Sequence, residues 1–122
     1  MLKKERPILP NLLKEGTFEI EKFQNQVVRP IIKMQHSLFI FLFKNYLSKK
    51  KIAFNSFSEK EKNEKIKQIF TKDLAFKNTI LGAVLGHFSN DELRFYVKNT
   101  SEINKRILQI TVQRLQDLPE EL

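Results

Sequence analysis

The chain has no cysteine and no tryptophan, and it has only three glycines and two histidines among its 122 residues. Without cysteine there can be no disulfide, no thiolate zinc site and no cysteine nucleophile. The glycines do not cluster, which excludes the glycine-rich loops that cradle phosphates and dinucleotides. His36 and His87 have neither His-x-x-x-His nor Glu-x-x-His spacing, the patterns that metal-binding helices use. The sequence therefore predicts no catalytic residues, no metal and no cofactor.

Long apolar runs are also missing. The most apolar stretch, from Leu38 to Phe43, is far shorter than the roughly 20 residues that cross a bilayer. The first residues, from Met1 to Pro10, carry charge but lack the apolar core of a signal peptide. Together with the absence of cysteine, which suits a reducing compartment, these features predict a soluble cytoplasmic protein without membrane contact.

Charge is distributed unevenly along the sequence. Lysines and arginines outnumber aspartates and glutamates by 22 to 14, which gives a formal net charge of +8. Residues 1–52 alone hold eleven basic and four acidic residues. A basic surface attracts phosphate-rich or acidic partners, although lysine also accumulates in chains rich in the residues of AT-rich codons. The candidate anion or nucleic-acid face consists of Arg29, Lys33, Lys44, Lys49, Lys50 and Lys51.

Proline and glycine divide the first part of the chain. Pro7, Pro10 and Gly16 lie in a stretch without apolar periodicity, so residues 1–16 are predicted to form a flexible arm and residues 17–122 a single helical domain. From the predicted N-cap Thr17, helical periodicity continues to about residue 50. Pro30 lies inside this helix and must kink or divide it, because proline removes a backbone donor and crowds the preceding turn.

Capping signals place the later helices. Ser58 with Glu61 and Ser89 with Glu92 form two capping boxes. Residues 58–86 form either one helix or two, and we favour a break that puts Asp73 in the first turn of a new helix. A short helix to about residue 98 and a last helix over residues 102–118 complete the chain. The predicted fold class is all-α, an antiparallel bundle of four to five helices around the long, Pro-kinked first helix.

The predicted first helix is apolar on more than one side. On a straight helix with about 100° between residues, its core stripe contains Ile20, Phe23, Val27, Ile31, Met34, Leu38, Phe41 and Leu42. A helix that is apolar nearly all round is either central to its domain or shared with a partner. We favour a homodimer, with a candidate dimer face made of Ile32, Phe39, Ile40, Phe43 and Leu47.

Five short segments resemble a known family. They are Lys22-Phe23-Gln24-Asn25, Arg29-Pro30-Ile31, Lys72-Asp73-Leu74-Ala75-Phe76, Asn104-Lys105-Arg106 and Gln113-Arg114-Leu115-Gln116-Asp117. With these segments, residues 22–117 resemble a family of small uncharacterised all-helical proteins from Bacteroidetes, some of which carry the label glyoxalase. The resemblance supplies no functional residues, and the label implies a glyoxalase-like lyase.

The sequence leaves three functional hypotheses open. The leading one is a non-enzymatic helical protein that acts through contacts with a protein partner or with a second copy of itself. The alternative is a nucleic-acid-associated protein that uses the basic face, and the lyase follows from the family label alone. Asn104 and Arg114 fall inside the apolar sector of the last helix, where we expect them to make interhelical hydrogen bonds.

Overall fold

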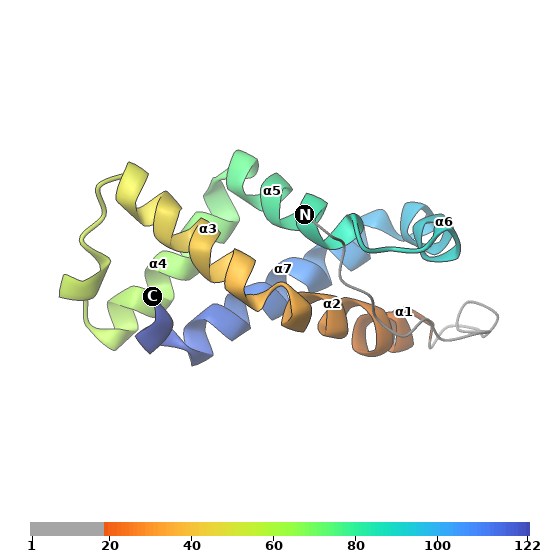
Figure 1. The fold of residues 1–122 in the computed structure, drawn as a ribbon, viewed down its shortest axis with the longest axis horizontal. Helices are drawn as coiled ribbons and strands as arrows, with labels where there is room; N and C mark the ends of the chain where they lie inside the picture. The colour runs from red at the N-terminus through yellow and green to blue at the C-terminus, as the bar shows by residue number, and fades with distance from the viewer. Residues whose placement is uncertain (1–18) are drawn as a thin grey trace.

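The structure, a computed structural model, describes residues 19–122 (Figure 1). The predicted arm, residues 1–16, and the predicted N-cap Thr17 lie outside the described residues. A first helical run consists of the consecutive segments α1 (Glu19–Phe23), the π-helix η2 (Gln24–Val28), α2 (Arg29–Met34) and α3 (His36–Lys49). It is followed by the 3-10 turn η3 (Phe54–Ser56), α4 (Glu59–Lys72), α5 (Leu74–Leu85), α6 (Asn90–Lys98), α7 (Thr100–Asp117) and the 3-10 turn η4 (Pro119–Glu121).

The described residues form no β-strand, which confirms the predicted all-α class. α7 packs against η2, α4, α5 and α6, so the last helix takes the central position that the sequence assigns to the first. Its buried face consists of Ile103, Ile107, Thr111 and Leu115, each four residues from the next, as expected for one face of an α-helix. None of the helices within residues 19–122 is long and apolar enough to cross a membrane.

The first run and α7 lie side by side and point in the same direction (Figure 1). Arg106 of α7 donates a hydrogen bond to Gln24 of η2. Further along both helices, Arg114 donates a hydrogen bond to His36 of α3. Because the residue numbers rise together along the contact, the predicted antiparallel packing does not extend to this pair of helices.

α3 and α5, in contrast, run in opposite directions. Tyr46 near the end of α3 donates a hydrogen bond to Asp73, which directly precedes α5. At the other end, the side chain of Gln35, just before α3, lies 2.7 Å from the ring of His87, just after α5. The antiparallel prediction therefore holds for these two helices.

Pro30 interrupts the first run, as the sequence predicts. It has no N–H to continue the regular ladder, and the turn before it is a π-helix, in which the N–H of Arg29 bonds to the carbonyl of Gln24 five residues earlier. This wider turn brings two adjacent side chains, Val27 and Val28, to the core side, and each is only 1% exposed. The positions of the run that face the core therefore shift at this point.

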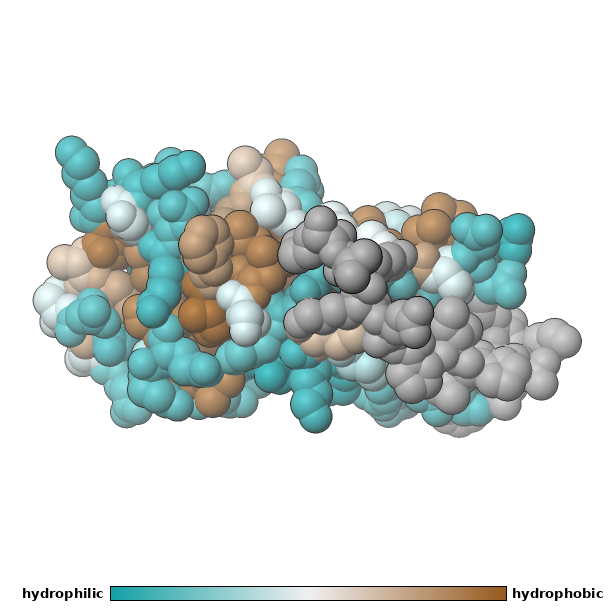
Figure 2. Space-filling model, viewed as in Figure 1, coloured by the Kyte–Doolittle hydropathy of each residue, from teal (hydrophilic) through white to brown (hydrophobic). Residues whose placement is uncertain are grey.

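A second irregularity separates α2 from α3 at Gln35, whose backbone (φ −94°, ψ 15°) leaves the regular α-helical region. Beyond it, the core side of α3 consists of Phe39, Phe43 and Leu47. Figure 2 shows apolar surface over the middle of α3, where Phe41 is 67% exposed. The prediction that Phe41 belongs to the core stripe is wrong, because the π turn and the break at Gln35 rotate α3 relative to a straight helix.

The same rotation removes the candidate dimer face from the surface. Ile32, Phe39, Phe43 and Leu47 are buried inside the chain, and Ile40 is partly buried against the same core. The assignment of these five residues to a dimer face is therefore corrected: four of them are core residues, and Ile40 packs against the same core. In the sequence they lie outside the predicted core stripe only because that stripe is drawn on a straight helix. The homodimer itself stays a prediction.

Both predicted capping boxes are confirmed. The side chain of Ser58 accepts a hydrogen bond from the N–H of Glu61, whose carboxylate accepts one from the N–H of Ser58. Ser89 and Glu92 make the same reciprocal pair at the start of α6. Each pair satisfies two backbone donors that have no partner within the helix.

Asp73 ends α4 and caps α5, which confirms the favoured break in this segment. Its carboxylate accepts hydrogen bonds from the N–H of Phe76 and from the hydroxyl of Tyr46, both at 2.9 Å. These bonds, the one from Phe76 first, lower the pKa of Asp73. Burial, and then the bond to Asp73, raises the pKa of Tyr46. The pair joins α3 to the junction of α4 and α5.

We expect the Asp73 carboxylate to make stability depend on acid pH. Because its pKa is lowered in the folded chain, its contribution is present above the unfolded-state pKa of about 4 and is lost as the pH falls through the folded-state value. The Asp73→Asn variant keeps an acceptor oxygen but does not titrate. We expect urea denaturation of both proteins, from neutral pH down to about pH 3, to show that their difference in unfolding free energy becomes smaller as the pH falls. A difference that is constant with pH would contradict the prediction.

Candidate binding groove

A groove of about 500 Å³ lies between the first run and α7. It is lined by Gln24, Arg29, Gln109, Ile110, Gln113, Arg114, Asp117 and Leu118. The first run supplies the first two of these residues, and α7 with the residue after it supplies the others. Amide and guanidinium groups dominate this lining, and the two aliphatic side chains give it an apolar part.

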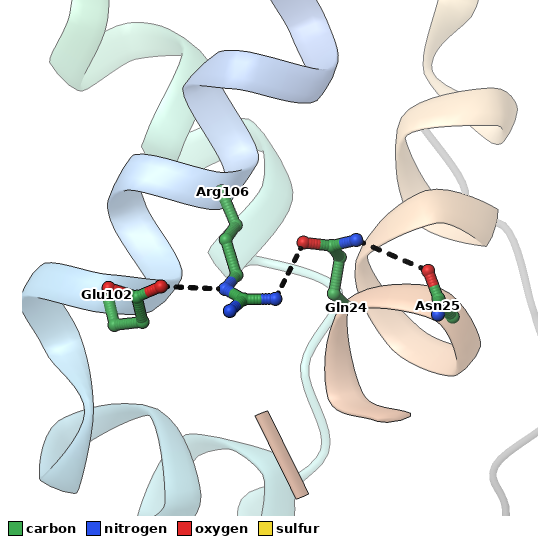
Figure 3. Close-up of polar contacts among 4 residues, drawn as sticks. All are labelled: Gln24, Asn25, Glu102 and Arg106. Atoms are coloured by element: carbon green, nitrogen blue, oxygen red, sulfur yellow. Dashed lines mark hydrogen bonds and ion pairs between the residues drawn. The ribbon is translucent and has the colours of Figure 1, made fainter. Parts of the chain in front are cut away.

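The wall formed by η2 is fixed to α7 through Arg106 (Figure 3). Its Nη1 donates to Gln24 Oε1 at 3.0 Å, and its Nε donates to Glu102 Oε1 at 2.9 Å. Gln24 in turn donates from Nε2 to Asn25 Oδ1 at 3.3 Å. Arg106 therefore joins a carboxylate of its own helix to an amide of the π turn, which positions Gln24 at the groove.

Two arginines line the groove, and each is held through its Nε by a neutral side chain. Arg29 Nε donates to Asn25 Oδ1 at 3.0 Å, and Arg114 Nε donates to His36 Nδ1 at 2.9 Å. A guanidinium can only donate, so Nδ1 must be the acceptor and the proton of His36 lies on Nε2. The Nε2–H group of His36 then donates a hydrogen bond to Glu121 Oε2, 2.9 Å away.

The outer ends of these two guanidinium groups make no further hydrogen bond or ion pair within residues 19–122. Each Nη group keeps its N–H donors available to a ligand in the groove. Asp117 is the acidic member of the lining, and its carboxylate accepts a hydrogen bond from Gln113 at 2.8 Å. Two arginines and one aspartate leave the lining with one net positive charge.

Residues of the candidate basic face have different neighbours in the structure. All six of its residues are exposed, but only Arg29 lines the groove. Lys44 lies on the side of α3 near Leu47 and Leu122, whereas Lys50 extends over the ring of Tyr46 towards α5. The assignment of all six to an anion or nucleic-acid face stays a prediction. The six residues are Arg29, Lys33, Lys44, Lys49, Lys50 and Lys51.

Sequence reasoning did not identify Arg114 or the glutamines as parts of a site. The signal that could have done so is the position of Arg114 inside an apolar sector, where a charged side chain needs a polar partner. That partner is His36. Asn104, the other polar residue in the sector, accepts a hydrogen bond from Tyr96 of α6 at 2.7 Å, which confirms the expected interhelical bond.

Among residues 19–122, no group of three or more acidic or histidine side chains could hold a metal ion. No family model, no curated protein and no solved structure matches the chain. The resemblance to the Bacteroidetes family and the lyase that its label implies therefore stay predictions.

Proposed function

We propose that this protein is a non-enzymatic helical protein of the cytoplasm that acts through contact with another protein, and that the groove is its contact surface. The observation that carries the proposal is the lining of the groove, in which amide and guanidinium groups lie beside aliphatic side chains. Such a surface suits a short segment of polypeptide, which brings both hydrogen-bonding groups and apolar side chains.

The amide side chains support a peptide ligand in particular. Each side-chain amide has two N–H donors and two acceptor lone pairs, so Gln24 and Gln113 keep a donor and an acceptor site beyond the bonds they already make, and Gln109 offers both kinds as well. Ile110 and Leu118 offer apolar surface to a side chain of that segment. The contact with Arg106 holds Gln24 in place before a ligand arrives, which reduces the entropy lost on binding.

Nucleic acid is a second candidate because all six residues of the basic face are exposed. Two features favour the peptide. Lys44 lies near Leu122 and Lys50 lies over the ring of Tyr46, so neither of them joins Arg29 in the groove. No aromatic side chain lines the groove to stack on a base.

Selection of random linear peptides displayed on phage against the purified full chain tests the proposal. We expect enriched peptides whose affinity falls at least about tenfold in Gln109→Trp, which fills the groove from an exposed position of α7. Asn78→Trp, at an exposed position of α5 that does not line the groove, is the matched control and should bind like wild type. Circular dichroism checks that both variants fold.

Two results would overturn the proposal. One is the absence of any peptide that distinguishes Gln109→Trp from Asn78→Trp. The other is tight binding of labelled DNA or RNA that weakens by about 10³–10⁵ between about 50 and 200 mM salt, the slope expected for six to ten phosphate contacts. That second result would support the nucleic-acid candidate instead.

A further inference from the structure

We infer that the groove recognises an acidic side chain of its partner, whose carboxylate is held between Arg29 and Arg114. This inference rests on the proposed function, because it names the chemistry of the segment that the groove binds. The two guanidinium groups, the net charge of the lining and the neighbouring apolar residues support it.

The two arginines are oriented before a ligand binds. Each uses Nε for a bond to a neutral acceptor, Asn25 for Arg29 and His36 for Arg114. An arginine that serves only to neutralise a carboxylate of its own chain would pair with that carboxylate, as Arg106 does with Glu102. Arg29 and Arg114 instead form no ion pair with a carboxylate and keep their Nη groups available, the arrangement that binds a planar oxyanion through two parallel hydrogen bonds.

His36 supports this orientation of Arg114 from behind. Its Nε2 donates to Glu121, so its Nδ1 stays an acceptor for the guanidinium. Glu121 therefore bonds to the ring and forms no ion pair with Arg114 itself. The arginine is positioned by a hydrogen bond to its Nε, which leaves its Nη groups for a ligand.

The charge of the lining favours a single carboxylate over a phosphate. Two arginines and Asp117 sum to one positive charge, which one carboxylate balances. A phosphate group with its charge of about −1.5 to −2 would leave excess negative charge beside Asp117. Ile110 and Leu118 share the groove with the arginines. The expected motif is therefore an aspartate or glutamate close to an aliphatic residue.

A double-mutant cycle on a peptide from the selection tests the inference. We expect the selected peptides to share an acidic residue, and Arg29→Gln and Arg114→Gln each to weaken binding at least about tenfold. Replacing the acidic residue of the peptide with its amide should weaken binding to wild type by a similar factor. The same replacement should make a smaller difference to each variant, because one of the two arginines that the carboxylate pairs with is already gone.

Arg94→Gln is the matched control for charge. Arg94 lies on α6 with 73% of its side chain exposed and is not part of the groove, so its loss should leave peptide affinity unchanged. Thermal unfolding checks that the three variants remain folded, and a variant that unfolds is replaced by Arg→Lys at the same position, which keeps the charge but loses the paired donors.

The outcomes separate the inference from the proposed function. The inference is overturned, and the proposed function stands, if the selected peptides require the groove but share no acidic residue. The same holds if Arg29→Gln and Arg114→Gln weaken binding equally for peptides with and without their carboxylate. A phosphorylated peptide that binds more tightly than its glutamate form overturns the choice of a carboxylate. Failure to select any groove-dependent peptide overturns the proposed function itself.

Discussion

Replacing Phe43 with alanine is expected to lower the free energy of unfolding by about 3–5 kcal/mol, the usual range for a buried phenylalanine. Phe43 is 0% exposed, and its ring lies 5.7 Å from that of Phe54 and 6.2 Å from that of Phe76. It therefore joins α3 to η3 and to α5 at the same point. Because domains of this size are stable by only about 5–15 kcal/mol, the loss should be visible as a large shift of the urea midpoint.

The matched control lies two residues earlier on the same helix. Phe41→Ala removes the same side chain from a position that is 67% exposed, so we expect a change within about 0.5 kcal/mol. A straight first helix predicts the opposite order, with Phe41 in the core stripe and Phe43 in a dimer face. Equal losses at the two positions would contradict the rotation of α3 that the structure shows.

Features encoded by a few neighbouring residues could be predicted from the sequence. The two capping boxes need only a serine and a glutamate three residues later, and both start helices where expected. The break at Asp73 is also local, because its carboxylate caps the helix that follows. The all-α class follows from the absence of period-two alternation together with these helix starts.

The phase of the first helix could not be predicted, because it depends on two irregularities that no local pattern specifies. Pro30 indicates an interruption but not its form, which is a π turn here. Gln35 carries no helix-breaking signal at all, yet the helix is interrupted there. Their combined rotation carries Phe39 and Phe43 into the core and leaves Phe41 outside. This one error of phase placed the exposed Phe41 in the core stripe and assigned buried residues to a dimer face, whereas the other seven residues of the stripe belong to the core or pack against it.

The groove was only partly predictable for a related reason. Arg29 is in the candidate anion face because it is basic and lies on the first helix, but its partners in the groove come from α7, far along the chain. Gln109 and Gln113 look like ordinary solvent-facing residues of an amphipathic helix. Only the parallel packing of α7 against the π turn shows that they lie opposite Gln24 and Arg29.

The π turn buries two adjacent valines, Val27 and Val28. In a regular α-helix neighbouring side chains are about 100° apart, so with Phe23 facing the core only one valine could share its direction fully. In a π turn the hydrogen bond spans five residues, so Phe23 and Val28 lie one turn apart while Val27 remains beside them. All three side chains are 0–1% exposed.

We therefore expect Val27→Asn and Val28→Asn each to lower the free energy of unfolding by about 2–4 kcal/mol, because each buries an amide and removes core packing. Gln26→Asn, at the exposed neighbouring position, should change stability by less than about 0.5 kcal/mol. Urea denaturation of the three variants measures the differences. If Val28→Asn were as harmless as Gln26→Asn, the turn would be a regular helix. The side chain of Gln24 would then point in another direction. Its contact with Arg106, which forms one wall of the groove, would change as well.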